Sequence, residues 1–422
     1  MNYFQNLRKK IKTNNAIICV IGLGYVGSAI IEKFNQNGFK TIGIDNDPKK
    51  LKSKFKTKRM KLTSDYSSIK LADVIIIALP TPLKSNMNPD LSYITNSMKK
   101  IKVYLKKGQL ISLESTTYPG TTEEIILPVL KKSKFNVSKD FFLVYSPERI
   151  SPELKVKDKN IKYKLHNTPK ICSGYSAHCK LLAAQLYKKI TKTVVLSSSL
   201  KVAEATKMIE NIFRSINIGL VNELKMFFKK IDVDINEALD LADTKPFGFT
   251  KFNPGPGYGG HCIPLDPFYL YWLAKKNKFD LQFIKTSGII NKKTINWITN
   301  NISNFIKKKK IKLFNKKILI LGVAYKQNID DTRESPAFKI ASKLKLKGYD
   351  FEYSDPYVKN IKFDNKIKKS KKINSKLLKK YPVVFIATDH TKFNYKLIAK
   401  SAKYLFDARN VIKNRKKNYF KV

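Results

Sequence analysis

A single cysteine at the end of a glycine-rich loop is the residue best suited to covalent chemistry. The loop reads Asn253-Pro-Gly-Pro-Gly-Tyr-Gly-Gly-His-Cys262. Glycines lack a Cβ atom, so their N–H groups can approach an anion or an oxyanion closely. A thiol placed there can act as a nucleophile, although most free cysteines serve as small buried hydrophobes. Taken alone, the loop leaves both interpretations of Cys262 open.

A second glycine pattern follows the first apolar run of the chain. Residues 17–21 lead directly into Gly22-Leu-Gly-Tyr-Val-Gly27, which is the pattern G-x-G-x-x-G after a strand. These glycines allow a tight turn, close approach of a pyrophosphate and close helix–strand packing. Asp45 ends the next apolar run, where a carboxylate binds ribose hydroxyls and repels a 2′-phosphate. The pattern predicts NAD rather than NADP, although Lys49 and Lys50 keep NADP open; a purely structural turn is the other alternative.

Short apolar runs must position these groups. Over residues 16–130 they alternate with polar, helix-like stretches, which is typical of a doubly wound parallel sheet. The expected strands are Ala16–Ile21, Thr41–Ile44, Val74–Leu79 and Leu110–Leu113, with Phe141–Val144 and Thr193–Leu196 as further candidates. Pro80-Thr-Pro82 and Ser115-Thr-Thr117 follow two of these strands, so we expect them at the carboxyl edge, where ligands bind.

The remaining chain predicts a helical middle and a second α/β unit. From Ser199 to about Lys230 apolar residues recur every three or four positions without a proline, which predicts one long helix. More helix is expected over residues 266–310. Apolar runs at 317–324, 351–355 and 383–387 predict strands, and the basic C-terminus is expected to be disordered. The fold class is therefore α/β: Rossmann-like domains at 1–198 and 313–422, joined by a central helical domain at 199–312.

Composition narrows the class of function. The net charge of +51 suggests polyanion binding, but only seven of the 83 basic residues are arginine, the residue that reads bases and phosphates best. We interpret the lysines as solvated surface and expect no specific nucleic-acid partner. No apolar run of membrane-spanning length and no signal peptide are evident. The four cysteines lack metal-ligand spacing, so we expect a cytoplasmic protein with free thiols and no metal.

Four further segments accompany the cysteine loop. They are Glu114-Ser-Thr-Thr-Tyr-Pro-Gly-Thr-Thr122, Tyr145-Ser-Pro-Glu-Arg149, Ala203-Glu-Ala-Thr-Lys-Met-Ile-Glu-Asn211 and Gly322-Val-Ala-Tyr-Lys-Gln-Asn-Ile-Asp-Asp-Thr-Arg-Glu-Ser-Pro336. Together with Gly257-Tyr-Gly-Gly-His-Cys-Ile-Pro-Leu-Asp266, this ordered set resembles the UDP-glucose/GDP-mannose dehydrogenase family over about residues 16–412. Lys245-Pro-Phe-Gly-Phe249, and Leu265 where the UDP-glucose branch has lysine, resemble the bacterial branch that oxidises UDP-N-acetylglucosamine for surface polysaccharides.

The resemblance implies oxidation of the C6 hydroxymethyl of a UDP-sugar to a carboxylate, with two NAD⁺ used in one site. In this scheme Cys262 attacks the C6 aldehyde, and the thiohemiacetal becomes a thioester that water hydrolyses. Lys207 and Asn211, four apart on one helix face, would hold an oxyanion or a water. The resemblance further implies that Glu148 is an acid/base group. Asp266 would orient water and Lys207, and Thr116 would position the water.

The resemblance also implies binding residues. The cofactor is expected to contact Gly22, Leu23, Gly24, Tyr25, Val26, Gly27, Asp45, Pro80, Thr81, Thr116 and Arg333. The UDP-sugar is expected to contact Glu148, Arg149, Lys207, Asn211, Lys245, Phe252, Gly255, Gly257, Tyr258, Gly259, Gly260, Lys326 and Arg409. Within this set the 252–260 loop would cradle the diphosphate with backbone N–H groups, and Lys245 would replace an arginine contributed across a dimer.

Some residues near these motifs are expected to be bystanders. His261 adjoins Cys262, but its side chain is expected to point elsewhere, and Cys19, Cys172 and Cys179 are expected in the core. A second glutamate of the family has no clean match, because Pro152 and Glu153 straddle its place.

Several alternatives remain at this stage. The same chemistry on UDP-glucose, UDP-GalNAc or UDP-ManNAc is one, and a dehydrogenase stopping after one hydride transfer is another. A non-catalytic nucleotide- or polyanion-binding protein is the most distant. The apolar stripe of the long helix predicts a homodimer or higher homo-oligomer, because such a stripe needs burial.

Overall fold

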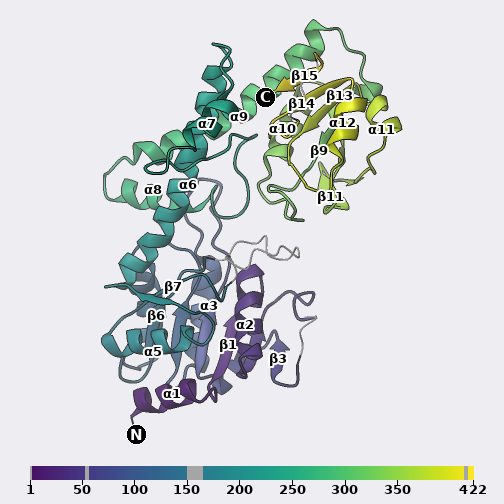
Figure 1. Cartoon of the computed structure of the whole chain (residues 1–422). Coiled ribbons are helices and arrows are strands. Elements are labelled where there is room, and N and C mark those ends of the chain that lie inside the picture. Colours follow the sequence, from purple (N-terminus) through teal and green to yellow (C-terminus); the bar gives the residue numbers. More distant parts are fainter. Residues whose placement is uncertain (1, 53–56, 150–164, 413–416) are drawn as a thin grey trace. The chain divides into compact units, whose positions relative to one another are not determined.

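The computed structural model describes residues 2–52, 57–149, 165–412 and 417–422. Its internal contacts divide the chain into two compact units. Unit 1 comprises residues 1–210 and 272–278, and unit 2 comprises residues 211–271 and 279–422. Each unit contains one large sheet covered by helices on both faces (Figure 1). The α/β class with a helical middle is confirmed.

Unit 1 contains an eight-stranded sheet in the order β3-β2-β1-β4-β5-β6-β7-β8. Neighbouring strands are parallel except β6 and β7, which are antiparallel. The strands are β1 (Ile17–Ile21), β2 (Lys40–Ile44), β3 (Met60–Thr63), β4 (Val74–Ile77), β5 (Leu110–Leu113), β6 (Phe142–Tyr145), β7 (Lys170–Gly174) and β8 (Val194–Leu196). The sequence pattern missed β3 and β7, whose alternation is broken by lysine and small polar residues.

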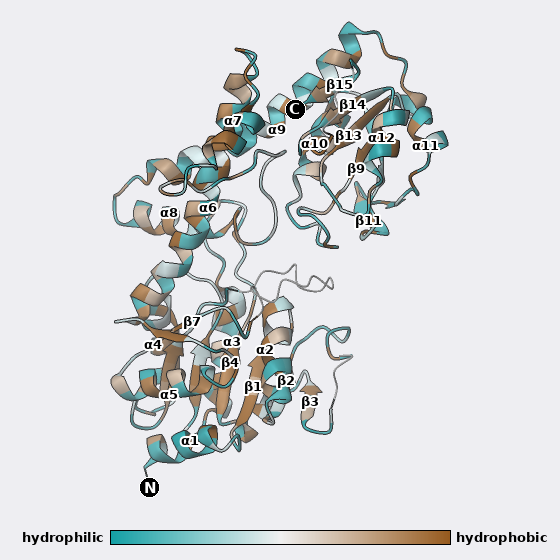
Figure 2. Ribbon diagram, viewed as in Figure 1, coloured by the Kyte–Doolittle hydropathy of each residue, from teal (hydrophilic) through white to brown (hydrophobic). Residues whose placement is uncertain are grey.

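Helices cover both faces of this sheet. On one face lie α1 (Tyr3–Lys12), α2 (Tyr25–Gln36) and α5 (Ala177–Tyr187), and on the other lie α3 (Ser92–Tyr104) and α4 (Leu127–Lys131). Successive side chains of a strand point to opposite faces, so β1 supplies Ile18 and Val20 to one core and Cys19 and Ile21 to the other. Apolar strands therefore lie between helices that are polar on their outer sides (Figure 2).

The middle of the chain is helical, as predicted. Helix α6 runs unbroken over Leu200–Phe228 and is followed by α7 (Ile235–Ala242), α8 (Asp266–Lys276) and α9 (Gln282–Lys308). None of the helices within the described residues is both long and apolar enough to cross a bilayer.

Unit 2 contains a parallel five-stranded sheet in the order β10-β9-β13-β14-β15. The strands are β9 (Lys317–Leu321), β10 (Asp350–Ser354), β13 (Val383–Ile386), β14 (Tyr404–Asp407) and β15 (Tyr419–Lys421), and β11 (Asn360–Phe363) and β12 (Lys366–Lys369) form a separate hairpin. Helices α9 and α10 (Pro336–Leu346) cover one face; α11 (Ser375–Lys380) and α12 (Tyr395–Ser401) cover the other.

The expectation of a disordered C-terminus is wrong for residues 417–422. Strand β15 pairs with β14, and the ring of Phe420 packs on Phe305 and Phe406 with centroids 4.4 and 5.1 Å apart. Apolar burial on the sheet edge thus outweighs the basic composition of this end.

Candidate functional site

The turn after β1 has the geometry of a dinucleotide site. Gly22 adopts φ +92°, a conformation that favours glycine. A Cβ on Gly27 would lie 1.8 Å from the Gly22 carbonyl oxygen, so only glycine fits where α2 packs on the turn. Gly24 caps α2 without a side-chain hydrogen bond, and a Cβ there would meet nothing within 4 Å. A helix N-terminus of this kind, with its first N–H groups unpaired within the helix, favours a bound anion such as a pyrophosphate.

Asp45 closes this turn from the end of β2. Its Oδ2 accepts a hydrogen bond from the Leu23 N–H at 2.7 Å, and its Oδ1 accepts one from the Asp47 N–H at 2.9 Å. Lys50 Nζ lies 3.4 Å from Oδ2. The carboxylate thus lies beside the place of a dinucleotide ribose, and one of the two lysines that kept NADP open is paired with it.

The other predicted cofactor residues of unit 1 lie at the same edge of the sheet. Pro80 is exposed and Thr81 is buried just past β4, and Thr116 is partly buried just past β5. Ser115 Oγ donates to the Leu79 carbonyl oxygen at 2.8 Å, which ties these two strand ends together. The carboxyl edge of the parallel strands therefore gathers the predicted contacts.

Glu148, just past β6, is 7% exposed and belongs to a buried ion-pair cluster. Lys170 Nζ lies 2.7 Å from Glu148 Oε2 and also pairs with Glu114, which follows β5. Glu148 Oε1 accepts a hydrogen bond from the Arg149 N–H at 2.7 Å. Burial raises the pKa of Glu114 to about 7, because the effect of desolvation exceeds that of Lys170. Pro152 and Glu153, near the unmatched family glutamate, lie outside the described residues.

The first turns of α6 carry Lys207 and anchor two loops of unit 1. Glu204 is fully buried and accepts hydrogen bonds from Gly120 N, Thr122 N and Thr122 Oγ1 at 2.6, 2.9 and 2.6 Å. Arg149 NH2 lies 2.7 Å from Glu210 Oε1. Lys207, whose side chain is 12% exposed, therefore stands between two anchored positions of the helix.

In unit 2, the cysteine loop ends in a helical turn. The carbonyl oxygen of Cys262 accepts hydrogen bonds from Leu265 N and Asp266 N at 3.1 and 2.8 Å, and Asp266 begins α8. The Asp266 side chain is 3% exposed, and its Oδ2 accepts from Asn211 Nδ2 at 2.6 Å. Cys262 is exposed, whereas Cys19, Cys172 and Cys179 are buried as predicted. An exposed thiol thus lies one helical turn before a buried carboxylate–amide pair.

The surroundings of His261 disfavour the charged form of its imidazole. Burial, with the nearby charge of Arg333, lowers the pKa of His261 below its ordinary value. Its imidazole is therefore neutral near pH 7.

Several N–H groups of the glycine-rich loop have partners within unit 2. Gly255 N donates to Asn222 Oδ1 at 2.9 Å, Tyr258 N to Asn291 Oδ1 at 2.9 Å, and Gly260 N to the Arg333 carbonyl at 3.0 Å. That the 252–260 loop cradles a diphosphate stays a prediction. The glycines also permit close packing: Cβ atoms on Gly255, Gly257 and Gly259 would lie within 2.8 Å of Arg409, Asn291 and Glu334, respectively.

Two cations of unit 2 are suited to an anion. Burial and the charge of Arg409 lower the pKa of Lys326, and burial also lowers the pKa of Arg409. Arg409 Nε donates to the Ala387 carbonyl at 3.0 Å, which fixes the guanidinium. Asp389 Oδ1 lies 3.8 Å from the same Nε, and the binding of a diphosphate by Lys326 and Arg409 stays a prediction.

The remaining predicted residues have other surroundings. Arg333 forms a fork with Asp331, with NH2–Oδ2 at 2.6 Å, and half of its side chain is exposed. Lys245 is exposed, with Nζ 4.9 Å from the centre of the Phe247 ring. Phe252 packs on Phe213 with ring centroids 5.7 Å apart.

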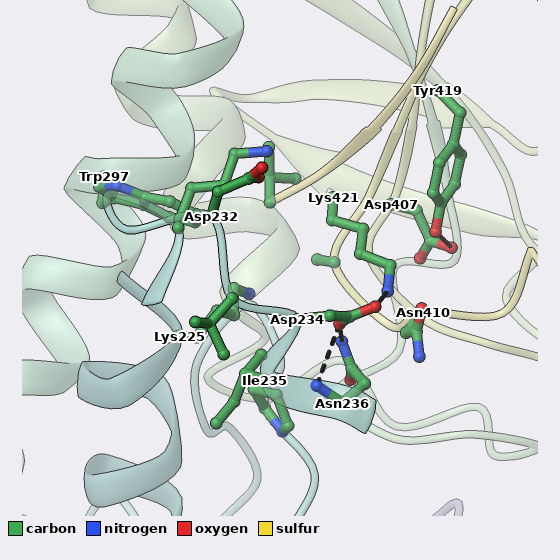
Figure 3. Close-up of a pocket in the computed structure, with 15 residues that line it drawn as sticks. Lys225, Asp232, Asp234, Ile235, Asn236, Trp297, Asp407, Asn410, Tyr419 and Lys421 are labelled. Carbon is green, nitrogen blue, oxygen red and sulfur yellow. Dashed lines mark hydrogen bonds and ion pairs between the residues drawn. The ribbon is translucent and has the colours of Figure 1, made fainter. Parts of the chain in front are cut away.

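Unit 2 contains a cavity of about 400 Å³ (Figure 3). Its lining residues include Lys225, Pro254, Trp297, Asp407 and Tyr419, and none of the predicted substrate residues. Lys225 Nζ donates to the Gly255 carbonyl at 3.3 Å, and burial lowers its pKa to about 7, with Arg409 adding to the effect. Lys225 therefore lines this cavity and also holds the glycine-rich loop by a hydrogen bond.

Sequence reasoning missed several residues that hold this arrangement. Glu204 and Glu114 lie inside quoted motifs, and the spacing of Glu204 and Lys207 gave a weak signal. Lys170 had none, because it belongs to a strand that the pattern did not reveal. Within the described residues, no group of three or more His, Cys, Asp or Glu side chains is placed to hold a metal ion.

Comparisons with known proteins identify the class. The glycine turn after β1, with Asp45 at the end of the next strand, is typical of a dinucleotide-binding domain. Models of the UDP-glucose/GDP-mannose dehydrogenase family match residues 16–191 (NAD binding domain), 201–293 (central domain) and 319–414 (UDP binding domain). The chain belongs to this family and is an NAD-dependent nucleotide-sugar dehydrogenase.

Individual relatives cover nearly the whole chain. Protein CapL of Staphylococcus aureus is 34% identical, over 94% of this chain and 96% of its own length. The UDP-N-acetyl-D-mannosamine dehydrogenase of Pyrococcus horikoshii is 30% identical over 94% and 96%, and its solved structure has a TM-score of 0.83 over 96% of this chain and 97% of its own. The UDP-N-acetyl-D-glucosamine 6-dehydrogenase of Salmonella typhi is 32% identical over 81% and 82%.

Proposed function

We propose that this protein is a UDP-N-acetylhexosamine 6-dehydrogenase that oxidises the C6 hydroxymethyl group to a carboxylate. The observation that carries the proposal is Cys262, an exposed thiol one helical turn before Asp266. Relatives covering most of the chain have the names of UDP-N-acetylhexosamine dehydrogenases.

Each residue has a defined part in this scheme. Gly22, Gly24, Gly27 and Asp45 hold NAD, which supplies the hydride acceptor for each oxidation. Cys262 Sγ attacks the C6 aldehyde carbon to form a thiohemiacetal, and the second oxidation leaves a thioester. Attack of water on the thioester carbon breaks the C–S bond and releases the carboxylate.

The neighbouring polar groups assist these steps. Lys207 and Asn211 lie one turn apart on α6, so both can donate to an oxygen on C6, and one such donor contributes about 3–4 kcal/mol. Glu148 accepts the proton of the attacking water, and Thr116 positions that water. Asp266 orients the Asn211 amide, and Lys326 and Arg409 bind the diphosphate.

The cysteine scheme is tested by Cys262→Ser with UDP-GlcNAc and NAD⁺. A serine hydroxyl is a far weaker nucleophile than a thiolate at neutral pH. The wild-type protein should yield two NADH per sugar, and the variant should lose steady-state turnover. Full turnover by the variant would contradict the covalent scheme, and one NADH per wild-type turnover would indicate a simple alcohol dehydrogenase.

The identity of the hexose requires a substrate panel. Leu265 and the motif around Lys245 favour UDP-GlcNAc, whereas relatives that cover 94% or more of the chain include a UDP-N-acetyl-D-mannosamine dehydrogenase. Comparing kcat/KM for UDP-GlcNAc, UDP-ManNAc, UDP-GalNAc and UDP-glucose decides among them. We expect an N-acetylated sugar to be preferred, and a preference for UDP-glucose would reject this part of the proposal.

We further propose a homodimer formed along α6. Ile209, Phe213, Leu220 and Phe227 on this helix are each at least half exposed. Large apolar side chains in such number favour burial against a partner. Light scattering should give a dimer or a higher homo-oligomer, and Phe213→Glu should shift it toward a monomer.

A further inference from the structure

The cluster around Glu148 contains a cation that the proposed chemistry has not yet used. Lys170 is 2% exposed, and its Nζ lies between the carboxylates of Glu148 and Glu114. A lysine enters a protein interior at large cost unless it is paired. Here the pairing involves the residue assigned as the base for thioester hydrolysis.

Strand direction explains how Lys170 reaches this edge of the sheet. Glu114 and Glu148 follow β5 and β6, which are parallel. Strand β7 is antiparallel to β6, so its first residue, Lys170, lies at the end where β6 finishes. Tyr145 pairs with Ser173, and the same register continued beyond β6 sets Glu148 opposite Lys170. The antiparallel direction of β7 thus places the cation of Lys170 at the carboxyl edge of the parallel strands.

We propose that Lys170 is a positioning residue for the hydrolytic step: its ammonium holds the Glu148 carboxylate, and Glu114 balances it from the other side. The inference rests on the proposed function, in which Glu148 takes a proton from the attacking water. Contacts support a fixed cation, because Lys170 Nζ also lies 5.1 Å from the centre of the Tyr187 ring, and Tyr187 Oη is hydrogen-bonded to Ser112 Oγ at 2.6 Å.

The other titratable groups facing this cluster stay neutral in the working range. Burial raises the pKa of Cys172, on β7, to about 12, and burial raises the pKa of Tyr187, on α5, well above its ordinary value. Burial also raises the pKa of Glu114 to about 7, so this carboxyl group changes its charge near neutral pH. Removing Lys170 and removing Glu114 should consequently have different effects on the pH dependence.

The first test is Lys170→Met, studied in the full chain by rapid mixing with NAD⁺ and the best UDP-sugar of the panel. We expect a normal burst of two NADH per active site, followed by a steady state about 100-fold slower, at the lower end of what a positioned general base contributes. Intact mass spectrometry of quenched samples should then show a UDP-uronosyl adduct on Cys262. Lys170→Arg should restore part of the rate.

A structural role would give a different result. Burst and steady state would then fall together without an adduct, and this outcome overturns the proposal. The matched control is Lys10→Met, which removes a lysine that lies 2.8 Å from Asp73 Oδ1 elsewhere in unit 1. It should leave the burst, the steady state and the pH profile unchanged.

The second test, Glu114→Gln, applies even if Lys170→Met fails to fold. The glutamine is nearly isosteric, and it lacks the negative charge that Glu114 gains as the pH rises through about 7. Turnover by Glu114→Gln should therefore depart from that of wild type above about pH 7, where the balancing charge is missing, whereas Lys170→Met should slow turnover at every pH. A profile identical to wild type refutes the proposal. Absence of NADH formation by the wild-type protein on every UDP-sugar refutes the proposed function itself, which distinguishes the two failures.

Discussion

The two sheets contain the same turn but use it differently. After β1, Gly22 adopts φ +92° and Asp45 Oδ2 accepts from Leu23 N; after β9, Gly322 adopts φ +78° and Asp355 Oδ2 accepts from Val323 N at 2.8 Å. An acidic residue at the end of the neighbouring strand thus closes a glycine turn in both units.

The surroundings of the two carboxylates separate their roles. Asp355 also accepts from the N–H groups of Ala324, Tyr357 and Val358, and His390 Nε2 lies 2.9 Å away. The Asp355 side chain is fully buried, and both of its carboxylate oxygens accept hydrogen bonds from groups of the protein. In unit 1, helix α2 begins at Tyr25, whereas in unit 2 the next helix begins at Pro336. The comparison shows that the two glycine turns differ in two features that favour a dinucleotide: only the unit 1 turn leads directly into a helix, and its carboxylate accepts fewer hydrogen bonds from the protein.

The largest effect is expected from Gly27→Ala. The new Cβ would lie 1.8 Å from the Gly22 carbonyl, so α2 must move away from the turn. We expect NAD affinity to fall more than about 100-fold and unit 1 to lose several kcal/mol of stability. Gly24→Ala is the control, because its Cβ enters open space; it should keep the melting temperature and weaken NAD binding alone. Normal NAD binding by Gly27→Ala would contradict the packing argument.

The next effect concerns Asp355→Ala, which removes the acceptor of the unit 2 turn. Loss of a buried, multiply bonded carboxylate should cost about 3–5 kcal/mol. The chain has two tryptophans, Trp272 in unit 1 and Trp297 in unit 2, so Trp272→Phe leaves a fluorescence probe for unit 2. Urea unfolding followed by Trp297 should show the loss, with NAD affinity retained. Equal loss of NAD affinity would make the two turns equivalent.

A smaller effect on the unit 1 turn should follow from Asp45→Ala. Hydrogen bonds to a charged acceptor contribute about 1.5–3 kcal/mol, so NAD should bind roughly 10- to 100-fold more weakly. Discrimination against NADP should also shrink, because the carboxylate that repels a 2′-phosphate is gone. Calorimetric titration with both cofactors measures this, and unchanged selectivity would remove Asp45 from the site.

The smallest effect is a difference in pH dependence. Burial raises the pKa of Glu114 and of Glu204 to about 7, so the folded state keeps protons that the unfolded chain releases. The stability of unit 1, followed by Trp272 in Trp297→Phe, should fall as pH rises from about 4.5 to 7. Glu114→Gln should reduce this pH dependence of stability. An unchanged pH dependence would show that Glu204 causes it.

Unit 2 should respond with the opposite sign. Burial acts to raise the pKa of Asp355, but hydrogen bonds from His390 and backbone N–H groups outweigh it, and the pKa lies below its ordinary value. Its contribution is therefore present above about pH 4 and lost as the pH falls further. Acid titration of Trp297 fluorescence distinguishes the two units.

Sequence alone predicted the parts of the molecule with local signals. The glycine turn and the long helix at 200–228 each have a residue spacing that follows from local backbone geometry. Their positions could therefore be predicted from the sequence. Strand β7 could not be predicted in this way, because the partners of its polar residues are distant in sequence. Lys170 pairs with Glu148, and Ser173 donates to a carbonyl oxygen elsewhere in unit 1. The sequence also did not reveal that Asn222 and Asn291, which are distant in sequence, accept hydrogen bonds from N–H groups of the glycine-rich loop.

The carboxylate of Glu204 has a mechanical consequence. It joins Gly120 and Thr122, in the loop that follows Thr116, to the helical face of Lys207. An α-helix is stiff over a few turns, so we expect movement of the helix turn that carries Lys207 to be coupled to movement of residues 120–122. Hydrogen exchange at the Gly120 and Thr122 amides gives a direct gauge of how often that link opens.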